Sequence, residues 1–198
     1  MGKFQFQRKH ILPLILLVIC LALATQLFRQ ANQIYMMEER IQGDMESSAE
    51  FLTQACSDLS RNLNTDKPDT TVLHYYITQL QTRFDLFRGH TFTYQQFSDV
   101  PVYNYGYAYQ IGTILSECSI IALGYDQLTD EERALYLDFL SELSEQIRLA
   151  FSFSYRYESE NLNEEFTYIM NGWKQLDQYW TDSAVFDYFN ANINGLGQ

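Results

Sequence analysis

Histidine is scarce in this sequence, and its scarcity narrows the chemistry open to the chain. The 198 residues contain His10, His74 and His90, and His10 adjoins a long apolar segment. The other two leave little from which to build a histidine metal centre or a Ser-His-Asp triad. The oxygen-rich stretch 58–66 lacks the glycine and the terminal glutamate of an EF-hand loop. We therefore expect no metal, no cofactor and no enzymatic activity.

Cysteine is also rare, with Cys20, Cys56 and Cys118 as the three examples. No two of them are close enough in sequence to suggest a zinc site. Cys56 and Cys118 fall on or beside apolar helical faces, which favours two buried free thiols. A disulfide between Cys56 and Cys118 is the alternative, since an oxidising compartment outside the cytoplasm would permit it.

Basic residues are few outside the N-terminal segment. Through Arg29 the chain has four basic residues and no acidic one, whereas the remainder has nine basic and 25 acidic residues. This remainder, with a formal charge of −16, should repel nucleic acid and anionic lipid or wall polymers. We therefore expect no nucleic acid among its partners, and the charge also favours solubility.

One long apolar run, Ile11 to Phe28 (ILPLILLVICLALATQLF), dominates the N-terminal part. As a helix it would rise about 27 Å, close to the ~30 Å hydrocarbon thickness of a bilayer. Three basic residues precede it, and the first acidic residue is Glu38. The positive-inside rule then predicts a single-pass protein of the cell membrane with its N-terminus in the cytoplasm. The expected parts are a cytoplasmic tail (1–10), a transmembrane signal-anchor (11–28) and an extracytoplasmic domain (29–198).

The same segment has the parts of a cleaved signal peptide, with Ala22-Leu23-Ala24 as an A-x-A cleavage site. Cleavage after Ala24 would make the protein secreted. However, no proline or glycine interrupts the helical pattern from Leu14 to Gln42, whereas signal peptidase needs an extended substrate. We favour the uncleaved anchor and keep secretion as the alternative; both place the domain outside the cytoplasm.

Apolar residues beyond the anchor recur at helical spacing, which predicts an all-α fold. The anchor helix should continue to a stop at 64–68, and more helices should follow over about 71–88, 104–124, 129–157, 166–180 and 182–193. The continuation of the anchor helix has an expected apolar stripe of Ala31, Ile34, Ile41, Met45, Leu52, Ala55, Leu59 and Leu63. The simplest architecture is an N-terminal transmembrane helix that continues into an extracytoplasmic antiparallel bundle of about five helices.

Local signals set several helix ends. Gly89 is the expected C-cap of the second helix, and 90–102 is the longest expected irregular stretch. Thr129-Asp130-Glu131-Glu132 matches a capping box, in which Thr129 and Glu132 each bind the other's backbone amide. Gly124 should end the third helix.

Aromatic residues crowd into 92–109, where Tyr103, Tyr105, Tyr107 and Tyr109 alternate along the chain. Exposed tyrosines can stack on sugar rings or grip a peptide, so these four are a candidate ligand surface. The favoured alternative is that they fill the space between the second and third helices.

These features indicate a membrane-anchored helical module of the cell envelope. We expect the lipid bilayer to hold residues 11–28 and another envelope protein to bind the domain; the sequence sets no oligomeric state. A ligand-sensing or wall- or sugar-binding module that uses 92–109 is the alternative, as is the form secreted after cleavage at Ala24.

Overall fold

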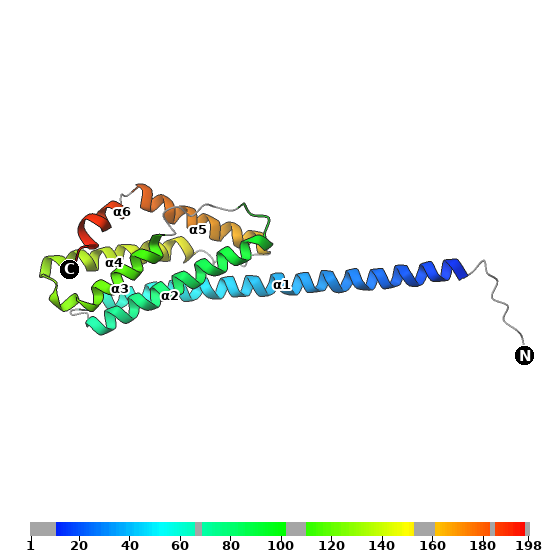
Figure 1. Ribbon diagram of the computed structural model, residues 1–198, viewed down its shortest axis with the longest axis horizontal. Helices are drawn as coiled ribbons and strands as arrows, with labels where there is room; N and C mark the ends of the chain where they lie inside the picture. Colours follow the sequence, from blue (N-terminus) through cyan, green and yellow to red (C-terminus); the bar gives the residue numbers. More distant parts are fainter. Residues whose placement is uncertain (1–10, 66–68, 102–109, 153–160, 183–184, 197–198) are drawn as a thin grey trace, which may run out of the picture. The chain divides into compact units, whose positions relative to one another are not determined.

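The computed structural model describes residues 11–65, 69–101, 110–152, 161–182 and 185–196. All secondary structure in these residues is helical, which confirms the predicted all-α class (Figure 1). The helices are α1 (Ile11–Leu63), α2 (Thr70–Tyr94), α3 (Ile111–Leu123), α4 (Asp130–Phe151), α5 (Leu162–Asp182) and α6 (Val185–Tyr188). Short 3-10 or π turns supplement them at Gln95–Phe97, Tyr125–Gln127 and Phe189–Ile193.

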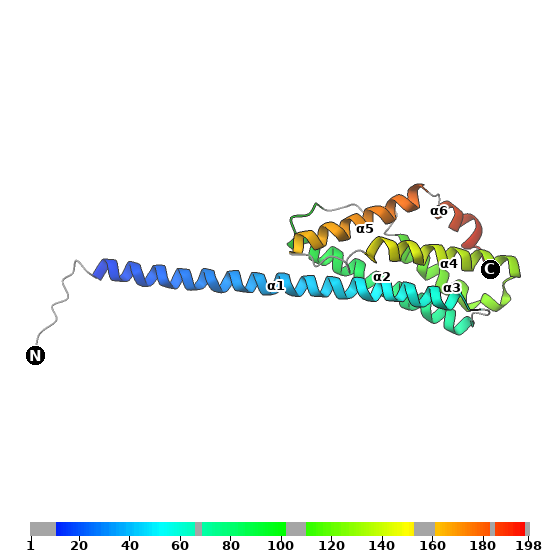
Figure 2. The ribbon, with the colours of Figure 1, turned by 180° about the vertical axis from the view of Figure 1, so that it is seen from behind.

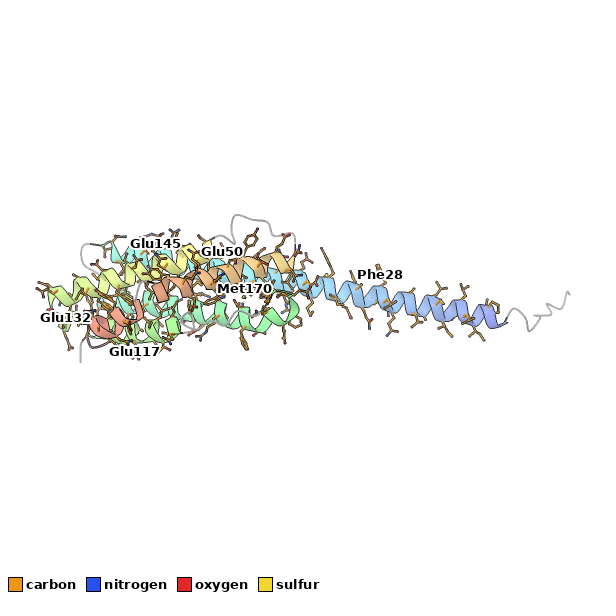
Figure 3. All side chains as sticks on the ribbon, turned by 90° about the horizontal axis from the view of Figure 1, so that it is seen from above. Phe28, Glu50, Glu117, Glu132, Glu145 and Met170 are labelled. Atoms are coloured by element: carbon orange, nitrogen blue, oxygen red, sulfur yellow. The ribbon has the colours of Figure 1, made fainter. Side chains whose placement is uncertain are left out.

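The chain divides into two compact units, Met1–Arg40 and Ile41–Gln198, and α1 contributes residues to both. In the first unit every described side chain from Pro13 to Arg40 is exposed. Phe28 points away from the helix in Figure 3, and 75% of it is exposed. Among the described residues, α1 is the one helix long and apolar enough to cross a membrane.

The helix α1 runs unbroken past the apolar segment, as the periodicity predicts. Thr25 does not disturb it, because its hydroxyl donates to the carbonyl oxygens of Leu21 and Ala22 at 3.0 and 2.8 Å. This local bonding satisfies the hydroxyl within the helix. Gly43 is tolerated inside the helix at a cost of about 1 kcal/mol relative to alanine.

The second unit encloses one hydrophobic core, to which the C-terminal part of α1 contributes a stripe. The predicted stripe residues Ile41, Met45, Leu52, Ala55 and Leu59 are buried there, and Leu63 is partly buried against them. Ala31 and Ile34, the first two members of the predicted stripe, are exposed in the first unit. The stripe therefore forms core only from Ile41 onward.

The helices α2, α3, α4 and α5 lie side by side in the second unit (Figures 1 and 2). The pairing of His74 with Ser119 and of Asp85 with Gly112 shows that α2 and α3 run in opposite directions. A Cβ added at Gly112 would lie 2.9 Å from Asp85 Oδ1. Glycine there therefore leaves room on α3 for the side chains of Asp85 and Arg88.

An aromatic cluster joins α2, α4 and α5. Trp173 is 1% exposed, and its ring centroid lies 4.9 to 5.8 Å from those of Phe84, Phe87 and Phe151. On α5 the side chains of Phe166, Ile169, Trp173 and Leu176, at helical spacing, are buried. Aromatic side chains bury large areas, so this cluster is a major part of the core.

Several predicted helix ends differ from the structure. Gly89 is not a C-cap: α2 continues through it to Tyr94 because Thr91 and Gln95 are also buried, and helix continuation keeps their backbone groups bonded. The predicted irregular stretch is thus helical as far as Phe97. The capping box at Thr129 is confirmed, with Glu132 Oε2 2.7 Å from the Thr129 amide nitrogen, and Gly124 follows α3 as predicted.

Candidate functional site

A surface groove of about 140 Å³ lies between α1 and α2 in the second unit. We call it the α1–α2 groove. It is lined by Phe51, Gln54, Ala55 and Asp58 of α1 and by Tyr75, Tyr76, Gln79 and Arg83 of α2. Within each set the residues lie one, three or four positions apart, and all of them except Ala55 flank the buried stripes of the two helices. Two helices packed by their apolar stripes therefore hold a row of aromatic and polar side chains along their shared edge.

Three aromatic side chains, those of Phe51, Tyr75 and Tyr76, line the groove. Phe51 is 49% exposed and Tyr75 is 56% exposed. The rings of Tyr75 and Tyr76 meet edge to face, with centroids 5.4 Å apart. Large exposed rings held by neighbours lose little conformational freedom when a ligand stacks on them, so this wall is suited to contact a ring.

Arg83 supplies the positive charge of the groove. Its Cζ lies 4.9 Å from the Phe51 ring centroid, which places the guanidinium over the ring. Within the described residues, Arg83 forms no ion pair with a carboxylate. The ion pairs found among the described residues instead involve Arg61, Arg88, Arg133 and Arg148, each paired with an acidic residue three positions away. The positive charge of Arg83 is therefore not neutralised by an ion pair with any described carboxylate.

Asp58 does not neutralise Arg83, although it lines the same groove. Its Oδ1 accepts from Gln54 Nε2 at 2.9 Å and pairs with Arg61 Nη1 at 3.3 Å. All three residues lie on α1, so the carboxylate is held on its own helix. The groove therefore contains a carboxylate, Asp58, that is already paired with Arg61, and a guanidinium, Arg83, that has no such ion pair.

A second polar cluster connects α1 to the far end of α2. His90 Nδ1 lies 3.2 Å from Ser48 Oγ, and the Tyr94 hydroxyl donates to Asp44 Oδ2 at 3.0 Å. Ser48 is 3% exposed and also donates to the Asp44 carbonyl oxygen at 2.7 Å. The residue types resemble a catalytic triad, but Asp44 binds Tyr94 rather than the imidazole, so the geometry required to orient the histidine is not met. The cluster serves to tie the two helices together.

His74 and His90 both make contacts with neighbouring helices. His74 Nδ1 lies 2.9 Å from the Ser119 carbonyl oxygen of α3, and Ser119 also pairs with Thr78 at 3.0 Å. His90 lies within α2 rather than in a loop. Among the described residues no three histidine, cysteine, aspartate or glutamate side chains gather as metal ligands would.

Cys56 and Cys118 are buried and are free thiols in the structure. Burial raises the pKa of each thiol far above its ordinary value, because the low-dielectric core disfavours the thiolate. The thiolate is the reactive species, so both side chains act as core residues.

The predicted ligand surface of Tyr103, Tyr105, Tyr107 and Tyr109 lies outside the described residues. The α1–α2 groove was not anticipated. The signal that could have revealed it is the pair Phe51 and Tyr75, large aromatic residues that fall off the apolar stripes of their helices. Comparison with protein families, with curated proteins and with solved structures found no match.

Proposed function

We propose that the chain is a single-pass membrane protein whose helical bundle lies outside the cytoplasm and binds another protein of the cell envelope. Residues 1–10 remain in the cytoplasm, 11–28 cross the bilayer, and 29–198 form the outer part. The role is that of an interaction or accessory module rather than an enzyme. Charge asymmetry supports the orientation, because basic residues that flank a span are retained on the cytoplasmic side.

The exposed apolar side chains of the first unit support the membrane segment. From Leu14 to Phe28, the large apolar side chains are 49% to 75% exposed. Leaving so much apolar surface in water costs about 25 cal/mol per Å², which a bilayer would relieve. The alternative is a secretory signal peptide, which needs the same apolar run and would be removed after Ala24.

One observation carries the proposal of a protein partner. Ile34, Tyr35, Met36 and Met37 are four consecutive apolar or aromatic residues on α1, with 40% to 62% of each exposed. We call them the juxtamembrane quartet. Consecutive residues point to different sides of a helix, so no single neighbouring helix of the same chain would cover all four.

The position of the juxtamembrane quartet argues against lipid as its cover. Ile34 comes six residues after Phe28, so it lies about 9 Å further along the helix, and Met37 lies about 13 Å further. The headgroup layer on one side of a bilayer is only about 5–7 Å thick. The far end of the quartet, Met36 and Met37, therefore projects beyond the headgroups, where a protein partner would cover it.

Site-specific photocrosslinking in the native membrane tests this proposal. A photoreactive amino acid at Ile34 or Met36 should yield one discrete adduct, whose mass differs from that of two copies of the chain. The same residue placed at Glu131, an exposed position of α4, should not yield that adduct. Replacing the juxtamembrane quartet with serines should abolish the adduct, whereas replacing Gln30, Asn32 and Gln33 with serines should not. An adduct of two copies alone, or none, would refute the proposal.

A ligand-binding module is the second candidate function. In the described residues, its support is the aromatic α1–α2 groove and not the tyrosines of 103–109. The two functions are compatible, because the groove and the juxtamembrane quartet use different residues.

A further inference from the structure

We propose that the α1–α2 groove binds a ligand that carries one six-membered ring and one carboxylate. This inference rests on the second candidate function, a ligand-binding module at this groove, and names its ligand class; it does not depend on the proposed partner binding. It rests on three properties of the groove: its size, its aromatic wall and the unneutralised guanidinium of Arg83.

The volume of the groove, about 140 Å³, is suited to a single ring. An engineered protein cavity of about 150 Å³ takes up one benzene molecule, so one ring of that size would fill the groove. Sites for drug-sized molecules are larger, at roughly 300–1,000 Å³.

The aromatic wall gives the ring its contact surface. Tyr75 is the most exposed aromatic side chain of the groove, and Tyr76 supports its ring edge to face. A flat aromatic ring or the apolar face of a sugar can stack against such a surface. The side-chain amides of Gln54 and Gln79 line the same groove, and amides can bond to ring substituents.

Arg83 selects for the carboxylate. A guanidinium offers donors in a planar fork that matches the two oxygens of a carboxylate. Phe51 lies against one face of this fork, with Arg83 Cζ 4.9 Å from its ring centroid. A carboxylate would pair with the N–H groups at the edge of the guanidinium. The negative charge of the domain does not prevent binding, since at physiological ionic strength charges more than about 8 Å apart are largely screened.

Ligand-observed NMR on the full chain in nanodiscs tests the proposal, with empty nanodiscs as the blank. Benzoate and glucuronate represent the two sources of a ring carboxylate, and benzyl alcohol and glucose are their uncharged counterparts. At least one acid should saturate with a dissociation constant on the order of 1 mM, and its counterpart should bind about tenfold more weakly or worse. The proposal is overturned if neither acid saturates below about 50 mM, or if the uncharged molecules bind equally well.

Variants locate the binding. Arg83→Gln should lower the affinity for the acid about tenfold, because a charge-assisted hydrogen bond is lost. The affinity of Arg83→Lys should lie between that of the natural chain and that of Arg83→Gln. Lys174→Gln is the matched control, since Lys174 is an exposed cation of α5 outside the groove; it should change the affinity less than twofold. Tyr75→Leu should weaken both acids while the helical circular dichroism stays unchanged. Equal effects of Arg83→Gln and Lys174→Gln would overturn the assignment to this groove.

Discussion

Gly172 of α5 lies directly against the backbone of Ala150 in α4. A Cβ at position 172 would overlap the Ala150 carbonyl oxygen and lie 2.9 Å from Cδ1 of the Phe151 ring. The two helices can approach this closely only because glycine has no side chain. This contact sits beside the aromatic cluster around Trp173, so the spacing of α4 and α5 fixes how the core rings meet.

Gly172→Ala should therefore destabilise the domain by about 1–3 kcal/mol, since the obstruction is backbone and cannot rotate away. Thermal unfolding of the full chain in detergent, followed by circular dichroism, measures the change. Gly89→Ala is the matched control: it is also inside a helix, but nothing lies within 4 Å of its added Cβ. It should stabilise α2 by about 0.5–1 kcal/mol. Two variants with the same sign of effect would contradict the packing described for Gly172.

The capping box of α4 makes a pH-dependent contribution to stability. Hydrogen bonds from the Thr129 amide and hydroxyl lower the pKa of the Glu132 carboxyl below its ordinary value. A lowered folded-state pKa means that this stabilisation is present above the unfolded pKa of about 4.3 and is lost as the pH falls through the folded value.

Thr129→Ala should cost about 1 kcal/mol at neutral pH, as removal of an N-cap hydroxyl commonly does. The difference in unfolding temperature between this variant and the natural chain should shrink as the pH falls from 7 toward about 3, because Glu132 becomes protonated in both. Glu131→Gln, one residue away and outside the box, should leave the pH profile nearly unchanged. A gap that stays constant with pH would show that Glu132 does not participate.

Thiol counting separates the free cysteines of the structure from a disulfide. In the folded chain, Cys56 and Cys118 should resist alkylation because both are buried and burial raises the pKa of each thiol. After unfolding without reductant, mass spectrometry should find all three cysteines alkylated. Alkylation of Cys20 alone would indicate a bridge between the other two.

The hydroxyl of Tyr136 ties α4 to α3. It donates to the Cys118 carbonyl oxygen, and the ring is fully buried. Tyr136→Phe should destabilise the domain by about 1 kcal/mol, because one buried hydrogen bond is lost while the carbonyl keeps its helical backbone donor. Tyr188→Phe, at a residue 41% exposed, should change the unfolding temperature little. Equal effects in the two variants would show that the hydroxyl of Tyr136 makes no stabilising bond.

The helical class and most core residues could be predicted because apolar spacing reports directly on burial. Leu73, Ile77, Leu80, Phe84 and Phe87 of α2 are buried as their spacing indicates. The prediction that α2 ends at Gly89 is wrong, because glycine weakens a helix by only about 1 kcal/mol and the burial of Thr91 outweighs that cost. Local residue preferences do not include such tertiary terms.

The α1–α2 groove could not be read from the sequence, because its two walls come from separate helices. Phe51 and Arg83 are 32 positions apart, and only the antiparallel packing of α1 and α2 brings the guanidinium over the ring. The lack of an acidic partner for Arg83 is likewise a property of the fold. In contrast, the capping box at Thr129 lies within four residues, so the sequence was sufficient to predict it.

Enzyme fusions after Gln198 test the central claim most directly, which is that residues 11–28 cross the membrane and hold the helical domain outside the cytoplasm. Alkaline phosphatase, which needs an oxidising compartment, should be active there, and a cytosolic fluorescent protein at the same position should remain dark. Deleting 11–28 should reverse both signals. A fluorescent fusion and an inactive phosphatase on the intact chain would contradict the account.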